Sequence, residues 1–191
     1  EEAALSLSSG GQWIAHGLGR SYGDCALAQQ VLLTLPMDKL LSFDAATGIL
    51  RCEAGLSLEK IIEKVLPFGW FLPVTPGTRH VTVGGAVASD VHGKNHHVDG
   101  CFSDWVLGFD LMLPDSSIVR CSRKENQALF LATCGGMGLT GIIIAVEIQM
   151  RKIDSAFIDE KVITTRGLRE SLDFFEICSD SMLSVQAPGS T

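Results

Sequence analysis

The chain has 191 residues, of which 46% are hydrophobic and 19% are charged, so it can bury a sizeable core and form a globular domain. Its net charge of -7 excludes a protein that binds nucleic acid through a basic surface. No apolar run has the length needed to cross a bilayer, and the most apolar one, residues 139–146, has the length of a strand. The acidic first residues differ from the basic start of a signal peptide, and we expect a cytoplasmic protein with peripheral membrane contact left open.

The first part of the chain combines short strand patterns with turn-forming residues. Runs of apolar and β-branched residues predict strands at residues 12–16, 31–35 and 49–54. Ser57 then precedes a segment with apolar side chains at helical spacing. This pattern predicts a helix that Ser57 caps and that Pro67 and Gly69 end.

A hairpin and a long central strand follow. The turn-forming residues 114–117 separate two strand patterns, at 105–113 and 118–121. The β-branched run at 139–150 predicts a central strand of the sheet. The remaining predicted elements are a strand at 156–163 and an amphipathic helix at 168–178. The whole pattern belongs to the α+β class.

A helix between the hairpin and the central strand is predicted from both of its ends. Ser122 and Glu125 have the spacing of a capping box, which predicts a helix around residues 129–131. Gly135 and Gly136 are expected to end it, because glycine readily adopts the left-handed conformation found after helices.

Six cysteines are scattered through the chain without a CxxC pair, and we expect them to be reduced, small apolar side chains rather than a disulfide framework. His92, His96, His97 and Cys101 raise the question of a zinc site. His92 and His96 converge only on a helix, however, and Gly93 and Asn95 between them disfavour one. We therefore predict no bound metal.

Two glycine-rich segments about sixty residues apart are the most informative part of the sequence. The first is Gly17-Leu-Gly-Arg-Ser-Tyr-Gly23, and the second is residues 76–95, which hold four glycines and a His-Gly-Lys-Asn cluster. Glycine lets the backbone approach a ligand closely, and successive N–H groups in such a turn attract anionic groups. Together the segments indicate backbone wrapped around one large phosphate-bearing cofactor.

A nicotinamide site is a weaker interpretation of the first segment. Its third glycine, Gly23, falls one position late for the GxGxxG pattern, and a turn rather than a helix is expected after it. Asp38 has the spacing of a ribose partner, but the Leu-Pro-Met sequence before it is typical of a loop. A plain tight turn is the alternative for this segment taken alone.

With GGMGLTG at residues 135–141, the two segments resemble the FAD-binding domain of the vanillyl-alcohol oxidase/p-cresol methylhydroxylase family of flavoproteins. The motifs GLGRSYGD, PGTR, VTVGGA, HGKNHH and GLTGII stand in the order typical of its decaprenylphosphoryl-β-D-ribose 2′-oxidase subfamily. The resemblance covers residues 13–150 and implies a two-lobed α+β domain with FAD between the lobes. We expect residues 1–150 to be this FAD-binding domain with an incomplete N-terminus, and residues 151–191 to be the truncated start of a substrate domain.

The resemblance also implies which residues hold FAD. The first segment matches the loop around the pyrophosphate, the second lies along the pyrophosphate and the flavin, and the third reaches the adenine or ribose end. The implied cofactor-binding residues are Gly17, Gly19, Arg20, Ser21, Tyr22, Gly77, Thr78, Thr82, Gly84, Gly85, Ala86, Ser89, Val91, Gly93, Asn95, Gly141 and Ile142. His92 and Lys94 match the group at the flavin edge that faces the substrate, and we expect them to be the catalytic residues.

Arg20 bears on how the cofactor is held. Several sugar and lactone oxidases of this family carry at this position a histidine that bonds covalently to the flavin 8α-methyl group. Arginine cannot form that bond, so we expect non-covalent FAD. His16 is the nearest alternative, and we expect it to be a packed strand residue.

The activity implied by the resemblance is oxidation of an alcohol, in which a hydride passes to the flavin while a base removes the hydroxyl proton. In the resembled subfamily the substrate is the ribose 2′-hydroxyl of a polyprenyl-phosphate sugar in cell-wall arabinose-type sugar synthesis, and a partner reductase uses the keto product. The alternatives are an oxidase of a free alditol or aldonolactone, a flavin-binding fragment without turnover, and a zinc or nucleotide-binding module that shares only the glycine loops.

Overall fold

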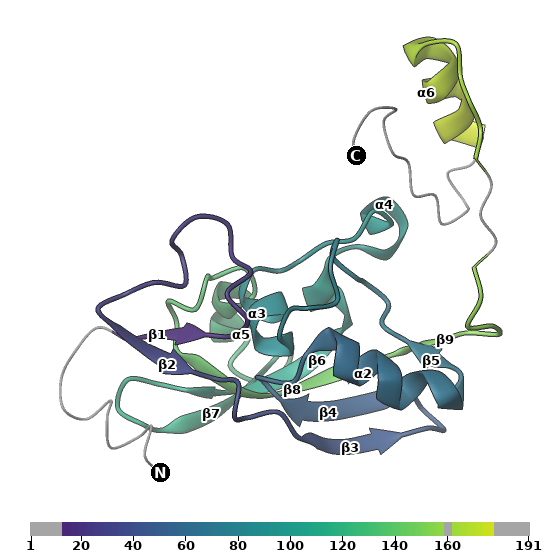
Figure 1. The fold of residues 1–191 in the computed structure, drawn as a ribbon. Coiled ribbons are helices and arrows are strands. Elements are labelled where there is room, and N and C mark those ends of the chain that lie inside the picture. Colours follow the sequence, from purple (N-terminus) through teal and green to yellow (C-terminus); the bar gives the residue numbers. More distant parts are fainter. Residues whose placement is uncertain (1–12, 159–161, 178–191) are drawn as a thin grey trace.

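The computed structural model describes residues 13–158 and 162–177, and its centre is a five-stranded antiparallel sheet (Figure 1). The strands are β3 (Leu40–Asp44), β4 (Ile49–Glu53), β6 (Val106–Met112), β7 (Ile118–Ser122) and β8 (Ile142–Gln149). Their order across the sheet is β3-β4-β8-β6-β7. β8 lies in the middle and pairs on both edges, which confirms the central strand that its β-branched sequence predicts.

Two smaller strand pairs accompany this sheet. β1 (Trp13–His16) pairs in parallel with β2 (Gln30–Leu33), and β5 (Trp70–Phe71) pairs with β9 (Arg151–Lys152). The first pair and β4 confirm the three strands predicted before Ser57. The sequence gives no signal for β3, β5 and β9, because β3 is mostly exposed and a two-residue strand has no periodicity.

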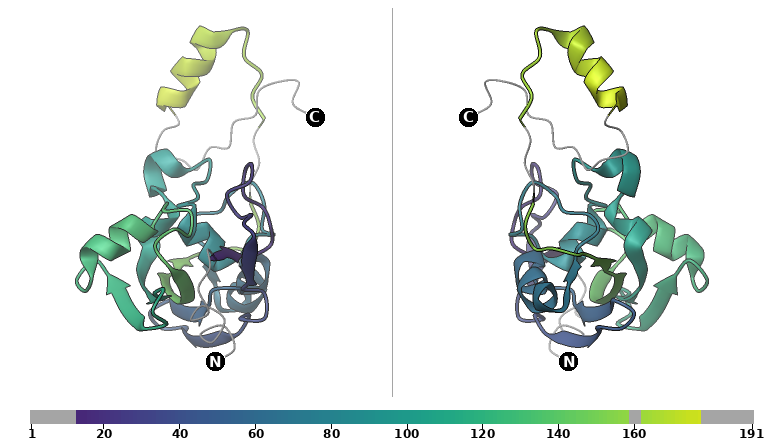
Figure 2. Two further views of the ribbon diagram at one scale, coloured as in Figure 1. Left: turned by 90° about the vertical axis from the view of Figure 1, so that its left-hand side faces the viewer. Right: turned by 90° about the vertical axis from the view of Figure 1, so that its right-hand side faces the viewer.

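Helices α2 (Leu58–Val65), α3 (Val83–Ala88) and α5 (Gln127–Thr133) cover one face of the sheet (Figures 1 and 2). Their buried apolar side chains form one core cluster with those of β4, β6 and β8. Within this layer the ring of Phe109 on β6 stacks on Phe130 of α5, with centroids 5.2 Å apart. No helix in the described ranges is long and apolar enough to span a membrane.

Several predicted ends and turns are confirmed. Ser57 caps α2, because its Oγ accepts a hydrogen bond from the N–H of Lys60 at 3.2 Å. A short 3₁₀ turn follows α2 and ends at Gly69, which has a φ of 74°. The predicted hairpin is the pair β6 and β7, whose turn is closed by the N–H of Leu113 donating to the carbonyl oxygen of Ser117 at 2.9 Å.

The capping box predicted at Ser122 is wrong. Ser122 is the last residue of β7, and its Oγ accepts hydrogen bonds from the N–H groups of Lys124 and Glu125 in a tight turn. A short polar side chain that bonds nearby backbone favours such turns as much as helix starts. α5 begins only after Asn126, whose φ is 49°. Its end is as predicted, since Gly135 follows with a φ of 74°.

The strand predicted at 156–163 is also wrong for the residues that can be tested. Residues 156–158 and 162–163 are irregular, and residues 159–161 lie outside the described part. No neighbouring strand offers them backbone partners in the described structure, so their apolar sequence alone does not make a strand. α6 (Leu168–Ile177) confirms the last predicted helix, apart from Cys178, which lies outside the described residues.

The sheet face opposite the helices carries a network of four charges, which we call the outer charge network. Arg51 lies 2.5 Å from Asp110 and 3.7 Å from Glu147, and Arg120 lies 3.5 Å and 3.0 Å from the same two carboxylates. Side chains alternate between the faces of a strand, so these charges lie opposite the buried core positions. Each arginine faces two acids, and the network is electrically balanced.

We predict that Phe109→Ala lowers the free energy of unfolding by about 3–5 kcal/mol, because Phe109 is fully buried and stacked on Phe130. Urea unfolding followed by circular dichroism measures the loss. The control is Leu131→Ala on α5, where the side chain is 54% exposed and a loss of about 1 kcal/mol or less is expected. Equal losses in the two variants would contradict a core centred on this ring pair.

Candidate functional site

The first glycine segment forms an exposed loop between β1 and β2. His16 closes the base of this loop, since its Nδ1 lies 2.8 Å from the carbonyl oxygen of Ala26. Gly19 and Gly23 adopt the left-handed conformation, with φ of 64° and 63°. Within the described part of the chain, no backbone N–H of residues 17–23 donates a hydrogen bond to the protein. The loop therefore presents a row of free donors, which is the property that anion binding needs.

The side chains at the tip of this loop are open to solvent. Arg20 and Ser21 are exposed, and Tyr22 is 97% exposed. The structure thus gives these three residues no role in packing. It leaves them available to a ligand that lies over the loop.

The two glycine segments meet at Gly17 and Thr82. A Cβ atom on Gly17 would lie only 2.4 Å from Oγ1 of Thr82, so a side chain at this position would force the segments apart. Thr82 is buried and caps α3, since its Oγ1 accepts a hydrogen bond from the N–H of Gly85 at 3.2 Å. The segments form one surface, as a single extended ligand requires.

The second segment is not the continuous loop that its glycines suggest, because it contains α3 and the single turn α4 (His96–Asp99). The N–H groups at the start of α3 are already used. Val83 donates to the carbonyl oxygen of Leu56 at 2.9 Å, and Gly84 donates to that of Ala54 at 2.8 Å. Among the described residues of this segment, the N–H groups of residues 77–79 donate to no protein acceptor. The free donors therefore lie before α3 rather than at its first turn.

The two adjacent glycines of α3 have different surroundings. Gly84 is buried, and a Cβ there would lie 2.9 Å from the Cβ of Ala54. Gly85 is exposed, and its Cβ would meet only the Oγ1 of Thr82, at 3.1 Å. Ala86 is fully buried in the core. Gly84 and Ala86 thus fit the helix to the sheet, whereas Gly85 leaves backbone open on the outer side.

The third segment packs on the far end of α3. The N–H of Gly135 donates to the carbonyl oxygen of Val87 at 3.1 Å, and that of Met137 donates to Ala88 at 2.8 Å. The first and third glycine segments therefore contact opposite ends of α3, which belongs to the second. Ser89, which ends α3, and Val91, which packs against the core, are half-buried at this same end.

Gly141 and Ile142 have a structural explanation within the sheet. A Cβ on Gly141 would lie 2.6 Å from the carbonyl oxygen of Met112, and Ile142 is 6% exposed and paired with Met112. Their side-chain positions face protein. Contact with a cofactor at these two residues would have to use the backbone.

The His-Gly-Lys-Asn cluster forms a loop, residues 92–95, that is held firmly on its inner side. Gly93 is buried, and a Cβ there would lie 2.8 Å from the carbonyl oxygen of Thr75. The side-chain amide of Asn95 donates to the carbonyl oxygen of Pro73 at 3.1 Å and to Oδ2 of Asp99 at 2.5 Å. Gly93 and Asn95 thus fix the loop against the chain just before residues 77–79, whose N–H groups are free.

The same loop is open on its outer side. The side chains of His92 and Lys94 are exposed, and neither hydrogen-bonds to a described residue. His96 differs, because its Nδ1 lies 3.1 Å from the carbonyl oxygen of Gly93. The structure therefore leaves His92 and Lys94 available to a ligand and gives His96 a structural contact.

The rings of His92 and His96 lie 5.5 Å apart although no helix spans both. Across residues 13–158 and 162–177, no group of three or more His, Cys, Asp or Glu side chains is arranged to hold a metal ion.

The five cysteines of the described ranges are free thiols, and Cys178 lies outside them. Cys52 and Cys121 lie in the core and Cys134 packs against it, and burial raises the pKa of Cys52 to about 12, that of Cys134 to about 11 and also that of Cys121. Protonated thiols are poor nucleophiles, so these three cysteines act as packing residues.

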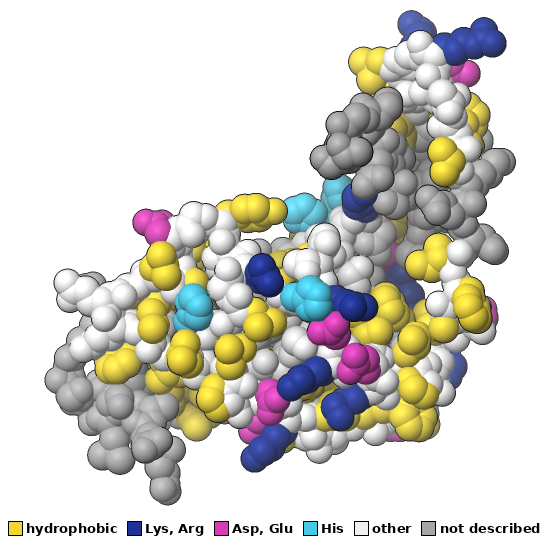
Figure 3. All heavy atoms as spheres, viewed as in Figure 1, with side chains coloured by type: hydrophobic (Ala, Val, Ile, Leu, Met, Phe, Trp, Pro, Cys, Tyr) yellow, Lys and Arg dark blue, Asp and Glu magenta, His cyan; other side chains and the backbone are white. Residues whose placement is uncertain are grey.

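Asp38 is engaged away from the glycine segments. Its Oδ2 lies 2.6 Å from Nζ of Lys60 on α2, and this contact lowers the pKa of Asp38. The nicotinamide interpretation thus loses its ribose partner. On the face of the molecule seen in Figure 3, basic, acidic and histidine side chains lie among one another, so neither sign forms a separate patch there.

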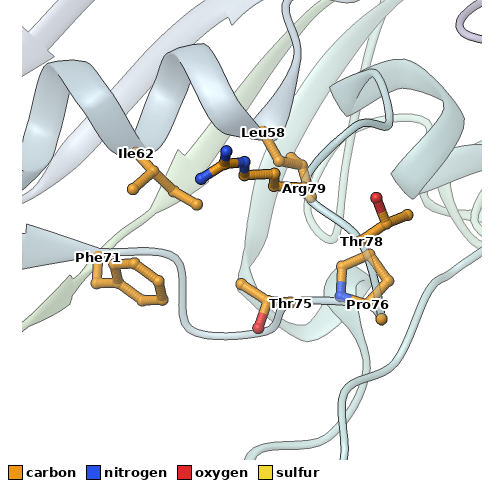
Figure 4. Close-up of a pocket in the computed structure, with 8 residues that line it drawn as sticks. Leu58, Ile62, Phe71, Thr75, Pro76, Thr78 and Arg79 are labelled. Atoms are coloured by element: carbon orange, nitrogen blue, oxygen red, sulfur yellow. The ribbon is translucent and has the colours of Figure 1, made fainter. Parts of the chain in front are cut away.

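A hollow of about 250 Å³ lies between α2 and the start of the second segment, and two predicted site residues, Gly77 and Thr78, line it (Figure 4). It is lined by Leu58, Ile62, Phe71, Thr75, Pro76, Gly77, Thr78 and Arg79. The sequence of α2 is that of an ordinary amphipathic helix, so it did not indicate that Leu58 and Ile62 line a hollow. Arg79 at its edge is held by Glu59, with Nε and Oε1 2.9 Å apart.

Residues 3–122, more than half of the chain, match the family described as the FAD binding domain. The chain belongs to this family and its cofactor is FAD, which confirms the resemblance seen in the motifs.

Three relatives illustrate its range. The chain is 39% identical, over 84% of its length, to the decaprenylphosphoryl-beta-D-ribose oxidase of Mycolicibacterium smegmatis, and covers 36% of that protein. It is 30% identical, over 78% of its length, to the mitochondrial D-2-hydroxyglutarate dehydrogenase of Bos taurus, and covers 28% of that protein. It is 32% identical, over 58% of its length, to the human Delta(24)-sterol reductase, and covers 22% of that protein. The chain therefore spans about a third or less of these relatives.

The described residues fit a bound FAD. Two rows of free N–H donors, at residues 17–23 and 77–79, are suited to the negatively charged pyrophosphate. A Cβ on Gly77 would meet no atom within 4 Å, and Gly85 is exposed, so both leave space for a close approach to the backbone.

We predict that Gly85→Val abolishes FAD binding while the protein still folds, because its side chain extends into the open space beside the glycine segments. Gly84→Val is the comparison, because Ala54 already fills the space beside Gly84. It should cost about 1–3 kcal/mol of unfolding free energy, and any loss of FAD affinity in this variant should follow from a shift of α3. FAD titration by fluorescence quenching and urea unfolding separate the two effects. Unchanged FAD affinity in Gly85→Val would remove α3 from the site.

Proposed function

We propose that this chain is the FAD-binding domain of an oxidoreductase that oxidises a secondary alcohol of a sugar to a ketone, and that the substrate is the 2′-hydroxyl of a polyprenyl-phosphate ribose. The observation that carries the proposal is the 39% identity, over 84% of the chain, to a decaprenylphosphoryl-ribose oxidase. The hydroxyglutarate dehydrogenase and the sterol reductase are less similar to the chain. Oxidation of a free alditol or aldonolactone is the alternative.

The backbone of the glycine segments binds and orients the cofactor in this proposal. The free N–H groups of residues 17–23 and 77–79 donate to the pyrophosphate oxygens. Gly85 allows the cofactor to lie against α3, and Arg20, Ser21 and Tyr22 cover it from the loop tip. Such binding through backbone donors depends little on side-chain identity.

His92 and Lys94 act at the reacting edge. When bound, the flavin supplies the redox chemistry by taking a hydride from the carbon that bears the hydroxyl group. A neutral imidazole at His92 is suited to accept the hydroxyl proton, and the ammonium group of Lys94 is suited to stabilise negative charge that develops beside it. The free, exposed state of both side chains supports these roles.

We assign residues 1–150 to the FAD-binding domain and residues 151–191 to the start of a substrate domain. Exposed apolar side chains support this boundary, since Phe157, Ile158 and Leu168 are 91%, 88% and 76% exposed. Apolar side chains gathered on a surface mark contact with another part of a protein or a partner. The residues that grip the substrate then lie in that following domain.

A lipid-linked substrate implies two partners for the full-length protein. One is the membrane surface, which the protein contacts peripherally from the cytoplasm while it binds the headgroup of the polyprenyl phosphate. The other is a keto-reductase that converts the 2′-keto sugar. Both proposals derive from the substrate named for the Mycolicibacterium smegmatis relative.

We predict that acid precipitation of the holoprotein releases all of its yellow colour into the supernatant. The reason is Arg20, which stands where a covalent linkage to the flavin would need a histidine. The absorbance spectra of pellet and supernatant measure the partition. Colour retained in the pellet would mean that another side chain is bonded to the flavin, with His92 the first to test.

We predict that the full-length protein reduces its flavin with a polyprenyl-phosphate ribose, and that His92→Ala slows this step by about 10²–10³-fold while FAD affinity changes little. Anaerobic stopped-flow absorbance measures the reduction rate, and fluorescence titration measures FAD binding. The backbone donors that hold FAD are unchanged by the substitution.

His97→Ala is the control, since the exposed side chain of His97 makes no hydrogen bond to a described residue, and the variant should retain the parent rate within about threefold. Reduction by free alditols but not by the lipid-linked ribose would favour the alternative substrate. A His92→Ala protein that loses FAD, while its remaining holo form reacts at the parent rate, would make His92 a cofactor anchor instead.

A further inference from the structure

Behind the loop that carries His92 and Lys94 lies a buried carboxylate. Asp99 is the last residue of α4, and its side chain is only 7% exposed. Both of its carboxylate oxygens accept hydrogen bonds from the guanidinium group of Arg151, one of them from Nη1 at 2.9 Å. This bidentate contact with Arg151 is the main cause that lowers the pKa of Asp99, so the carboxylate is charged at neutral pH.

The carboxylate is joined directly to the loop. Oδ2 of Asp99 also accepts a hydrogen bond from the side-chain amide of Asn95, at 2.5 Å. Asn95 is the neighbour of Lys94, and its amide donates a second bond to the carbonyl oxygen of Pro73. A shift of Asp99 would therefore break the contact that fixes the end of the loop.

Arg151 is itself held from two sides. It belongs to β9, where it pairs with Phe71, and its guanidinium lies over the ring of Trp105, 5.3 Å from the centroid. Trp105 in turn donates from Nε1 to the backbone carbonyl oxygen of Asp99 at 2.9 Å. These contacts join the loop to the strand that follows Met150, outside the glycine segments.

We propose that Asp99 and Arg151 are a pair of positioning residues that hold His92 and Lys94 at the flavin through Asn95. The proposal rests on the proposed function in one respect, namely that the loop faces the flavin. The pair touches neither FAD nor substrate. It fixes the loop from behind and couples it to β9, at the boundary with the segment that we assign to the substrate domain.

The outer charge network shows what a purely structural arrangement looks like in the same fold. Asp110 of β6 accepts from Arg120 on the neighbouring β7 and from Arg51 on β4, which lies beyond β8, and its side chain is 21% exposed. Both hydrogen bonds stay within the sheet. Asp99 is more deeply buried, and one of its contacts leads to a loop with two free side chains, which a packing role does not require.

The test uses the full-length protein with Asp99→Asn, which keeps the shape of the side chain and removes its charge. The first readout is hydrogen–deuterium exchange of the flavin-free protein over residues 96–100, where the N–H groups of residues 96 and 98–100 donate to the carbonyl oxygens of Gly93, Asn95 and His96. We expect their protection to fall about tenfold. The second is the dissociation constant of sulfite, which adds to flavin N5 and reports positive charge beside it, and we expect about a tenfold increase.

Three further variants separate loss of positioning from loss of stability. Asn95→Ala removes the link and leaves the ion pair in place, and it should reproduce both effects. Asp110→Asn is the matched control, which should lower thermal stability without changing exchange at residues 96–100 or sulfite affinity. Lys94→Ala should weaken sulfite binding by itself, and combining it with Asp99→Asn should give less than the sum of the two effects, since both act through one loop.

The inference is overturned if Asp99→Asn and Asn95→Ala lower stability but leave exchange at residues 96–100 and sulfite affinity at their parent values. A different outcome would contradict the proposed function instead. If exchange rises as expected but neither His92→Ala nor Lys94→Ala changes sulfite affinity, the pair fixes a loop that does not lie at the flavin, and the positioning role falls with the assignment of that loop.

Discussion

The close contact between Gly84 and Ala54 sets the position of α3, and the rest of the site depends on that position. Because Gly84 has no side chain, the first turn of α3 comes near enough to donate hydrogen bonds to the carbonyl oxygens of Ala54 and Leu56. This contact sets Thr82 against Gly17 and leaves Gly85 on the outer side. The joining of two remote glycine segments is thus a consequence of helix-on-sheet packing.

In the proposed site, backbone groups bind the cofactor and side chains act on the substrate. The groups suited to the cofactor are backbone donors in two loops, and the exposed polar side chains lie in a third place, the loop of residues 92–95. Backbone donors recognise pyrophosphate whatever the side chains are. This division agrees with the relatives, because proteins named for a ribose, a sterol and a hydroxy acid share the domain. The cofactor domain alone does not set the substrate.

The loop of residues 92–95 joins these two functions. On its inner side Gly93 contacts Thr75, and Asn95 bonds to Pro73, so the loop rests on the residues that lead to the second row of donors. On its outer side His92 and Lys94 stay open. A side chain that acts on a substrate needs a fixed backbone and polar atoms that are not already hydrogen-bonded to the protein. This loop meets both conditions.

Much of the fold was determined by the sequence itself. Local patterns predicted the central strand, the hairpin and α2 with its cap, because periodicity and turn chemistry act over a few residues. The motifs predicted the family and the segments that we propose as the site. Ser122 was misread because a serine that bonds nearby backbone serves turns and helix starts alike.

The tertiary structure alone decided which glycine serves which purpose. Gly84 and Gly85 are identical neighbours in sequence, yet one is packed on Ala54 and the other is open. Asn95 looks like a site residue in the motif, but its contacts with Pro73 and Asp99 make it a support for the loop. The physical reason is that burial and hydrogen-bond partners come from segments distant in the chain, and a residue's own neighbours in sequence do not record them.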